Sequence, residues 1–461
     1  MDWTESLDLR SLAHQYATGQ TTPEAVIKLV YDRIEQYADP AVWIYLAPIA
    51  QSLARAKALA DRDPRRLPLY GIPFAIKDNL DWAGIPTTAG CPAYAYTPER
   101  SATVLERLCA AGAIPIGKTN LDQFATGLVG TRTPYGVCRN PFNSDYIPGG
   151  SSAGSGAAVS AGLVSFALGT DTAGSGRVPA AFTNIIGLKP TKGLISTRGL
   201  VPAVRTLDCV SIFALTCEDA AAVLQVAGDY DAEDGFSRQP TVNALPEIAK
   251  LRVGIPGDQD LTFFGNHSAE QQYRDAIAHL QTLGCTIVPI DFQPFAEAAQ
   301  LLYGGAWVAE RLAAIADFLN PALMNPTVYE IINGGKRYDA VDAFRGIYRL
   351  ADLRQLADTQ WQAMDVLAVP TTGTIYTVAE VEAEPIALNS NLGRYTNFVN
   401  LLDLCAVAVP SGFQSNGLPT GLTLIALAWH DASLCHLGAA YHDLLGGTLG
   451  ATKVPLRRHE G

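Results

Sequence analysis

The sequence predicts an α/β protein with a mixed, mostly parallel, twisted central sheet that is covered by helices. Short apolar segments typical of strands alternate with amphipathic segments typical of helices along most of the 461 residues. The composition is 48% apolar and only 17% charged, which supplies enough apolar sequence for a large buried core. No low-complexity linker divides the chain, so we expect a single domain over residues 1–461 with no separate C-terminal domain.

The order of the elements follows from the apolar periodicity. Residues 1–60 are predicted to be helical, and in TTPEAVIKLVYDRIEQY Thr22 suits the N-cap while Pro23 suits the first helical position. A further helix is predicted over 105–111. Strands are predicted at 71–77, 113–120, 164–169, 184–188, 251–255, 286–290 and 366–369. Helical patterns over 296–320 and 338–363 indicate a helical cap inserted at about residues 230–365.

Charge and cysteine content limit the possible partners. The net charge is −12, and an acidic surface repels phosphate backbones, so we expect no nucleic acid partner. The eight cysteines are scattered without a CxxC pair, which favours reduced core residues in a cytoplasmic protein. The N-terminus is acidic and amphipathic, unlike a signal peptide, and no apolar run reaches the roughly 18 residues of a membrane span. We therefore expect a soluble protein without a membrane partner.

Two Gly/Ser-rich segments stand out, PGGSSAGSG at 148–156 and LGTDTAGSGR at 168–177. A flexible linker is the plain interpretation of such composition. The first segment, however, runs directly into AAVSAGLVSFALG, a small-residue helix followed by an apolar strand. Apolar sequence of this kind must be buried, so the glycines indicate close approach of backbone to backbone or to ligand.

Three common glycine motifs do not fit the first segment. A phosphate-binding loop needs a lysine at its end, and a dinucleotide fingerprint needs a third glycine where Ala157, Ala158 and Val159 stand. Gly150 to Gly154 match G-x-S-x-G, but no strand directly precedes them. That motif also requires a histidine base, and the histidines beyond it mostly fall on predicted helices or at the terminus.

The segments GIPFAIKDN, PGGSSAGSG and LGTDTAGSGRVPAAFTNIIGLKPT resemble the amidase signature family, and the tail segment FVNLLDLCAVAVPSGFQSNGLPTGLTLIA resembles its last core strands. The resemblance implies that Ser175 is the nucleophile and that Ser151 lies between Ser175 and the base Lys77. It also implies a cis peptide bond between Ser151 and its neighbour in the serine pair, Ser152. It implies no metal and no cofactor.

The base places a physical requirement on Lys77. A solvated lysine has a pKa near 10.4 and is protonated at neutral pH. Lys77 follows Phe-Ala-Ile in a predicted inner strand, and burial there would lower its pKa by several units. The alternative is a structural ion pair, for example with the adjacent Asp78.

The turn after the second Gly/Ser segment is expected to stabilise a developing oxyanion through the backbone N–H groups of Thr172, Ala173, Gly174 and Ser175. Most relatives carry glycine where this chain has Ala173, and the added methyl is expected to narrow the site. Ser152, Asp171 and Arg177 are expected to support the turn. A plain ion pair accounts equally well for Asp171 and Arg177.

Within this family, TNLDQFATGLVGTRTPYGVCRNPF and LYGGAWVAERLAAI resemble the allophanate hydrolases. The resemblance implies a small anionic amide as substrate, with Tyr303, Arg311 and the Gly127 backbone as its contacts. A guanidinium suits a carboxylate because it offers two parallel donors. Tyr303 and Arg311 share a face if their segment is one straight helix. The alternative is an amphipathic helix with Tyr303 in the core and Arg311 reaching water.

The implied reaction is hydrolysis of the terminal amide of allophanate to N-carboxycarbamate and ammonia through an acyl-enzyme. Other amidase specificities stay open, namely the glutamine-amide subunit of a tRNA-dependent amidotransferase and a small aliphatic amidase. A non-catalytic scaffold of the same fold is the third alternative. A homodimer is expected.

Overall fold

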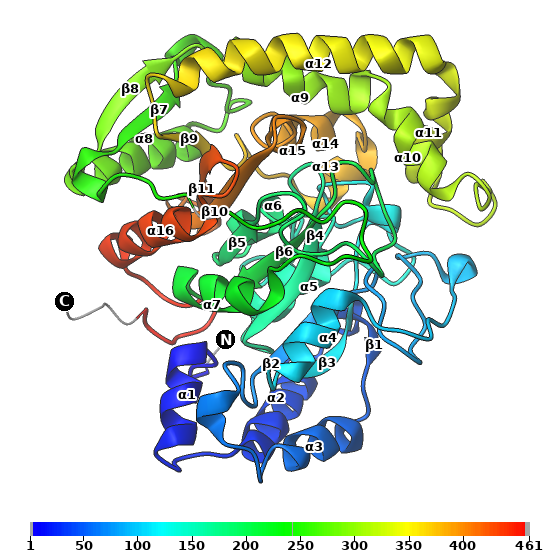
Figure 1. The fold of residues 1–461 in the computed structure, drawn as a ribbon, viewed down its shortest axis with the longest axis vertical. Coiled ribbons are helices and arrows are strands. Elements are labelled where there is room, and N and C mark those ends of the chain that lie inside the picture. The colour runs from blue at the N-terminus through cyan, green and yellow to red at the C-terminus, as the bar shows by residue number, and fades with distance from the viewer. Residues whose placement is uncertain (1–2, 242, 457–461) are drawn as a thin grey trace.

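A single sheet of eleven strands crosses the molecule in a computed structural model that describes residues 3–241 and 243–456 (Figure 1). The strand order is β1-β3-β2-β4-β6-β5-β10-β11-β9-β7-β8. The strands are β1 (Trp43–Leu46), β2 (Pro73–Lys77), β3 (Ile114–Thr119), β4 (Phe166–Asp171), β5 (Ile186–Lys189), β6 (Cys209–Ala214), β7 (Arg252–Pro256), β8 (Thr286–Ile290), β9 (Val366–Pro370), β10 (Leu404–Phe413) and β11 (Pro419–Leu427).

Helices cover the sheet, which confirms the α/β class. They are α1 (Leu9–Ala17), α2 (Pro23–Tyr37), α3 (Ile49–Ala58), α4 (Thr103–Ala110), α5 (Ala153–Ser160), α6 (Val178–Phe182), α7 (Cys217–Ala227), α8 (His267–Thr282), α9 (Gln293–Gly304), α10 (Trp307–Ile315), α11 (Pro326–Asn333), α12 (Ala340–Trp361), α13 (Val378–Ala383), α14 (Ala387–Leu392), α15 (Phe398–Leu401) and α16 (Asp431–Leu445). The α12 helix runs along the outer edge of the molecule, above α9 in the view of Figure 1.

The sheet is mixed, as predicted, but parallel neighbours do not dominate it. Among the described strands, four pairings are parallel, β2 with β3, β2 with β4, β7 with β8 and β7 with β9. The other six are antiparallel. Parallel neighbours need a long crossover, usually a helix, whereas antiparallel neighbours can follow one another through a turn. The strands β10 and β11 form such a hairpin, and β6, which was not predicted, pairs antiparallel with both its neighbours.

Local signals place the N-terminal elements. The helix α2 begins at Pro23, and the Thr22 hydroxyl accepts a hydrogen bond from the Ala25 N–H at 3.2 Å, as an N-cap does. The helices α1, α2 and α3 lie within the segment 1–60, which was predicted to be helical. The short strand β1 was not predicted and pairs antiparallel with β3 at the edge of the sheet.

The segment expected to be a helical cap contributes to the sheet as well. Between residues 230 and 365 the chain forms α8 to α12, but also β7 and β8 at one end of the sheet. The helix expected over 296–320 is two helices, α9 and α10, which are separated at Gly305. Gly305 has extended backbone angles, so the hydrogen-bond ladder of α9 cannot continue through it.

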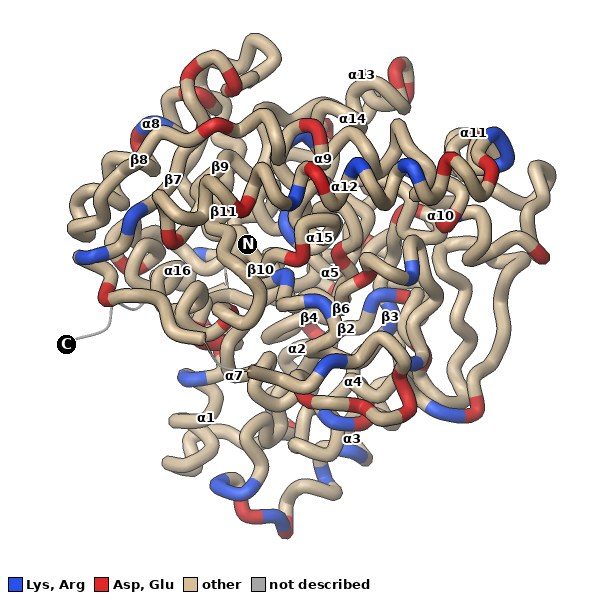
Figure 2. Tube along the Cα trace, turned by 45° about the horizontal axis from the view of Figure 1, so that its top comes forward, with Lys and Arg blue, Asp and Glu red and all other residues tan. Residues whose placement is uncertain are grey.

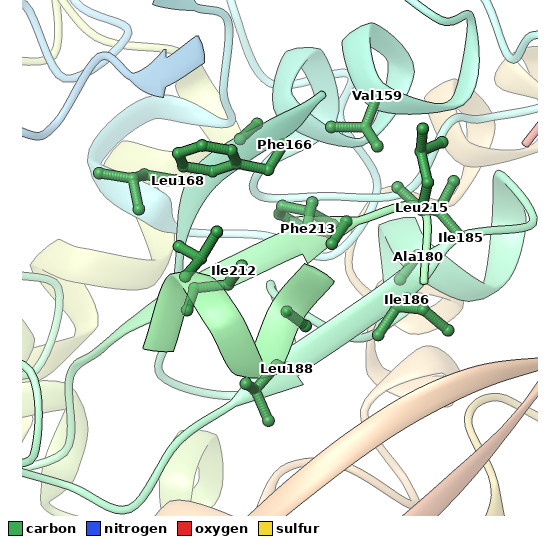
Figure 3. Close-up of a cluster of buried hydrophobic side chains, with 14 of the residues drawn as sticks. Val159, Phe166, Leu168, Ala180, Ile185, Ile186, Leu188, Ile212, Phe213 and Leu215 are labelled. Atoms are coloured by element: carbon green, nitrogen blue, oxygen red, sulfur yellow. The ribbon is translucent and has the colours of Figure 1, made fainter. Parts of the chain in front are cut away.

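The centre of the core lies on β4, β5 and β6 and is built from large apolar side chains (Figure 3). Phe166 of β4 and Phe74 of β2 stack with ring centroids 4.9 Å apart. This packing holds β2 and β4 side by side and in register, with Phe74 paired to Phe166. As a result, Lys77 at the end of β2 and Thr170 near the end of β4 face the same edge of the sheet, where the carboxyl ends of parallel strands commonly carry sites.

Candidate active site

Lys77 is completely buried and hydrogen-bonded to two hydroxyl groups. Its Nζ atom donates to Ser151 Oγ at 2.7 Å and to Thr170 Oγ1 at 2.7 Å. Burial lowers the pKa of Lys77 to about 7, although the carboxylates of Asp122, Asp171 and Asp208 act in the opposite direction. A neutral amine is therefore available at physiological pH, which is what a base at this position requires.

Asp78, which was considered as an ion-pair partner for Lys77, is paired with Lys118 instead. Asp78 bonds Lys118, with an Oδ1–Nζ distance of 2.8 Å and both side chains buried. The Asp78 carboxylate also accepts hydrogen bonds from the Thr88 backbone and hydroxyl. Lys118 lies on β3, so this pair links the end of β2 to β3, and Lys77 forms no ion pair with any residue that the structure describes.

Ser151 begins the loop that leads into α5, and its peptide geometry differs from the expectation. The cis peptide bond joins Gly150 to Ser151 and therefore precedes the first serine, whereas the resemblance placed it between Ser151 and Ser152. Gly150 lies against the buried Asp122, since a Cβ atom there would stand 2.2 Å from Asp122 Oδ2. Only glycine fits between Asp122 and the serine pair.

Ser152 connects the serine loop to β4. Its hydroxyl donates to the Thr170 carbonyl at 3.2 Å and accepts from the Thr170 N–H at 3.4 Å. The Thr170 hydroxyl also accepts a hydrogen bond from the Lys77 amine. Thr170 therefore holds both the serine loop and the amine in place. Thr170 was missed from the sequence because its role depends on the pairing of β2 with β4.

Ser175 lies in the turn between β4 and α6 and is 2% exposed. Its hydroxyl donates to the Gly127 carbonyl at 3.4 Å, while the contact with Ser151 that a proton relay requires is not made in this state of the described chain. The backbone N–H groups of Ala173, Gly174 and Ser175 donate to no acceptor in the described parts of the chain. Unpaired N–H groups in a buried turn are rare, and they are suited to receive a ligand oxygen.

A buried ion pair shapes this turn. Asp171 and Arg177 are both inaccessible and form two hydrogen bonds, Nε to Oδ2 at 2.8 Å and Nη2 to Oδ1 at 2.9 Å. Although burial alone raises the pKa of Asp171, the guanidinium lowers it below its ordinary value. Gly174 adopts φ +138°, and a Cβ atom on it would stand 2.4 Å from Thr396 Oγ1. The ion pair thus links the two ends of the turn, and Gly174 packs directly against Thr396.

Thr172 is tied to a second buried carboxylate. Its hydroxyl donates to Asp208, which also accepts the N–H groups of Ala203 and Val204. Burial raises the pKa of Asp208 to about 6, partly offset by these hydrogen bonds. The Ala173 methyl packs in an apolar cluster that includes Trp307 and is bordered by Tyr303. The methyl therefore occupies space between the turn and the α9–α10 region.

Tyr303 and Arg311 are in contact, as expected. The assumption that one straight helix carries both was wrong, because Tyr303 lies on α9 and Arg311 on α10. Arg311 is 2% exposed, and its Nη2 atom donates to the Tyr303 hydroxyl at 3.3 Å. Its guanidinium lies over the Tyr303 ring at 5.2 Å. It also donates to Thr126 Oγ1 at 2.9 Å, directly before Gly127. The expectation that Arg311 reaches water is excluded by its burial.

The loop that carries Gly127 is held by Asp122. This carboxylate accepts the N–H groups of Gly130 at 3.0 Å and Arg132 at 2.9 Å, and burial raises its pKa. Arg132 in turn donates to the Thr126 carbonyl at 2.9 Å. Asp122 therefore positions two glycines. One is Gly127, whose carbonyl accepts a hydrogen bond from the Ser175 hydroxyl, and the other is Gly150, which precedes Ser151. No signal in the sequence indicated this role, except that Asp122 lies in the TNLDQFATG segment.

A cleft opens beside this loop and is lined by Arg132, Tyr303 and Asn389. Asn389 also receives the Leu128 N–H on its Oδ1 atom at 2.7 Å. Among the described residues, no group of His, Cys, Asp and Glu is arranged to hold a metal ion. In the same residues, no helix has the length and apolar character needed to cross a membrane.

Residues 25–435 match the Amidase family, and the chain therefore belongs to that family. This confirms the resemblance drawn from the sequence motifs.

The similar proteins include urea amidolyases, glutamyl-tRNA(Gln) amidotransferase subunits and an allophanate hydrolase. The chain is 47% identical to the urea amidolyase of Lachancea kluyveri over 92% of its own length, but it spans only 24% of that protein. It is 33% identical to a glutamyl-tRNA(Gln) amidotransferase subunit of Symbiobacterium thermophilum, over 95% of this chain and 96% of that one. The solved structure of Kluyveromyces lactis allophanate hydrolase superimposes with a TM-score of 0.89 at 44% identity, covering 95% of this chain and 72% of that chain.

Proposed function

We propose that this chain hydrolyses the terminal amide of allophanate and releases N-carboxycarbamate and ammonia. The observation that carries the proposal is a buried amine with a pKa near 7 that is hydrogen-bonded to Ser151, together with the unpaired N–H groups of the turn that carries Ser175. The likeness to allophanate hydrolase supports the choice of substrate, as does the buried Arg311 beside Gly127.

The proposed mechanism follows from these contacts. Ser175 attacks the amide carbonyl while its proton passes to Ser151 and the proton of Ser151 passes to neutral Lys77. The oxyanion accepts hydrogen bonds from the N–H groups of residues 172–175. The protonated Lys77 returns a proton through Ser151 to the leaving nitrogen, ammonia departs, and water then hydrolyses the acyl-enzyme by the same relay.

The substrate's other end is a carboxylate, and the proposal assigns it to Arg311 and Tyr303. The Arg311 Nε atom is buried and has no partner among the described residues, so the guanidinium retains donor capacity. A charge-assisted hydrogen bond in a buried site contributes about 1.5–3 kcal/mol. The remaining part of the proposal, a homodimer, stays a prediction from the sequence.

The test is ammonia release from a panel of amides by the wild-type chain and by Ser175→Ala. We expect turnover of allophanate that Ser175→Ala abolishes, with unchanged circular dichroism. Ser160→Ala, which removes a buried hydroxyl from α5 outside the site, is the matched control and should retain activity.

Glutamine belongs in the same panel because of the similarity to the amidotransferase from Symbiobacterium thermophilum. Preferential turnover of glutamine would replace allophanate by that alternative. Normal turnover by Ser175→Ala would remove the whole assignment.

A further inference from the structure

A second cavity, of about 220 Å³, lies apart from the cleft that Tyr303 lines and shares no lining residue with it. This cavity is found where β5 ends and where β6 and β10 begin. Because β5 runs antiparallel to both of these neighbours, the three ends meet at one edge of the sheet. The charged residues that line the cavity are Lys192, Arg205, Arg238, Arg354, Asp208 and Asp403.

The two carboxylates do not neutralise the four cations. Asp403 is paired with Arg238, whose Nη1 atom lies 2.8 and 3.0 Å from the two carboxylate oxygens. Asp208 accepts hydrogen bonds from the Thr172 hydroxyl and from two backbone N–H groups, and it forms no ion pair with a residue that the structure describes. The other three cations of the cavity are therefore left without a bonded counter-ion in the described chain.

Lys192 is the most enclosed of these three cations. It is half-buried, and its amine forms no hydrogen bond and no ion pair with any described residue. Burial lowers the pKa of Lys192, and the positive charges of Lys189 and Arg354 act in the same direction, against the carboxylate of Asp403. A bound anion would compensate a cation that the chain itself leaves without a partner.

Arg205 and Arg354 are exposed and stand at the rim of the cavity. The Arg205 guanidinium lies over the Phe236 ring at 5.3 Å and forms no hydrogen bond with a described residue. Arg354, on α12, donates from Nη2 to the Leu401 carbonyl at 2.9 Å and has no other bonded partner in the described chain. Since a guanidinium carries five N–H donors, both arginines retain donors for a ligand.

The backbone beside Lys192 is held in place without a ligand. Gly193 adopts φ +75°, and a Cβ atom there would stand 2.4 Å from the Phe236 carbonyl oxygen. The Gly193 carbonyl accepts the Arg238 N–H at 2.9 Å, and the Lys192 carbonyl accepts Arg238 Nη1 at 3.2 Å. The Arg238 guanidinium also lies over the Trp429 ring at 4.7 Å. The wall of the cavity is thus preformed, so binding requires little ordering of the chain.

This concentration of positive charge is local. The whole chain has a net charge of −12, and acidic and basic residues are interspersed over the trace in Figure 2. A nucleic acid or an anionic membrane binds to an extended basic surface. Three free cations around one small cavity instead suit a small anion.

We propose that this cavity binds a phosphate group, either as inorganic phosphate or as a phosphate monoester. A phosphate monoester carries a charge of about −1.5 to −2 at pH 7 and has three strong acceptor oxygens. The three free cations come from three separate segments, so each can donate to a different oxygen. A carboxylate has one charge and two oxygens and would leave a cation without a partner. The site goes beyond amide hydrolysis and does not depend on it.

The first experiment is calorimetric titration of the full chain with inorganic phosphate at constant ionic strength. We expect one bound phosphate per chain, and Lys192→Met should raise the Kd about tenfold or more, because a charge-assisted hydrogen bond is lost. Arg354→Met, which changes only an exposed side chain, should also weaken binding, by a smaller factor because solvent screens its charge. Lys57→Met, at an exposed lysine of α3, is the control and should retain the wild-type Kd.

Absence of phosphate binding by the wild type would overturn the proposal. So would a wild-type Kd in both Lys192→Met and Arg354→Met. Circular dichroism of each variant checks that the fold is retained.

The second experiment separates this cavity from the residues proposed to bind the amide substrate. Arg311→Met removes the cation beside Tyr303 and should leave the Kd of phosphate unchanged. Loss of phosphate binding in Arg311→Met, with wild-type affinity in Lys192→Met, would place the ion at the substrate site and overturn the proposal. Because the readout is binding of phosphate, it is independent of whether allophanate is the substrate.

The third experiment distinguishes the two sources of the phosphate group. Glycerol 3-phosphate that binds about tenfold more tightly than inorganic phosphate would assign the cavity to a phosphorylated metabolite, whose organic part extends past the exposed rim. Equal or weaker binding of this ester would assign it to the free ion, and either result supports the site. Acetate at the same ionic strength should bind about tenfold more weakly than phosphate, because it carries one charge. Acetate that binds as tightly as phosphate would overturn the choice of ligand.

Discussion

At the scale of single residues, the proposed chemistry depends on how Lys77 is held. The two hydroxyl groups at 2.7 Å are neutral partners, so they accept hydrogen bonds without supplying the negative charge that would keep the amine protonated. The carboxylates that surround the site are engaged elsewhere, Asp171 with Arg177 and Asp122 with backbone N–H groups. Removal of water then determines the pKa of Lys77.

We expect kcat/KM to rise with pH through about 7. The base acts only when unprotonated, and with the Lys77 pKa near 7 the unprotonated fraction increases across this range. Lys77→Met should lose about 100- to 10,000-fold above pH 7, the usual contribution of a general base, and the loss should shrink at lower pH, where the wild-type amine is protonated. The measurement is initial ammonia release from pH 5.5 to 8.5, and a wild-type profile that is flat there would place the base elsewhere.

Arg311→Met is expected to affect anionic and neutral amides unequally. Loss of a charge-assisted contact should reduce kcat/KM for allophanate by about tenfold to a hundredfold. Malonamide, which is neutral, should change by less than about threefold. Arg205→Met, at an exposed arginine, serves as the control. Equal losses on both substrates would show that Arg311 does not bind the substrate carboxylate and only positions Thr126 and Tyr303.

The sequence was informative for the residues that lie in compact motifs. Lys77, Ser151 and Ser175 each stand in a short segment that resembles the family, and their burial could be inferred from the apolar flanks. Thr170, Asp122 and Asp208 could not be found in this way. Each acts through a partner on a different loop or strand, such as Thr172 for Asp208, and one sequence does not reveal those pairings.

At the scale of elements, strands with strong apolar runs and turn residues at their ends were predictable, and β8 begins and ends at the predicted residues. The strands β1 and β6 were not predicted. β1 has only four residues and is at most half-buried, so it is too short to show a clear period. β6 is a buried run of six residues that directly follows Asp208, and it could have been recognised from the sequence. Because β6 was overlooked, the remaining strands alternated with helices along the sequence, and this alternation predicted a mostly parallel sheet.

Gly174→Ala should damage the turn that carries Ser175. The residue adopts φ +138° and has no room for a Cβ beside Thr396, so we expect a loss of about 2–3 kcal/mol in the free energy of unfolding. Gly235→Ala is the control, because a Cβ there meets nothing within 4 Å and the backbone is ordinary. Urea unfolding followed by circular dichroism measures both. Equal stability of the two variants would contradict the strained conformation of the turn.

At the scale of the whole molecule, one continuous sheet joins segments that lie far apart in the sequence. The strand β1 near the N-terminus and β8, more than 200 residues later, lie at opposite edges of the same sheet. The middle positions are taken by β6 and β5, whose side chains fill the core in Figure 3. We infer that the stability of every part of the site depends on the packing of these central strands.

Ile212→Ala is expected to destabilise the molecule far more than Ile49→Ala. Both delete the same atoms, but Ile212 on β6 is fully buried whereas Ile49 at the start of α3 is 40% exposed. A buried deletion of this size costs about 2–5 kcal/mol, and an exposed one is expected within about 1 kcal/mol. Differential scanning calorimetry of both variants measures the difference. Similar shifts would show that the sheet centre does not dominate stability.

The contact between the Ser175 hydroxyl and the Gly127 carbonyl has a consequence for the protein without ligand. A hydroxyl has one proton, so Ser175 cannot donate to Gly127 and to Ser151 at once. While the first contact lasts, the Ser175 hydroxyl is not activated through Ser151, and the serine is no stronger a nucleophile than an ordinary alcohol. A substrate whose own N–H replaces Ser175 at the Gly127 carbonyl would release the hydroxyl toward Ser151, so that arrival of the correct amide itself switches on the attack.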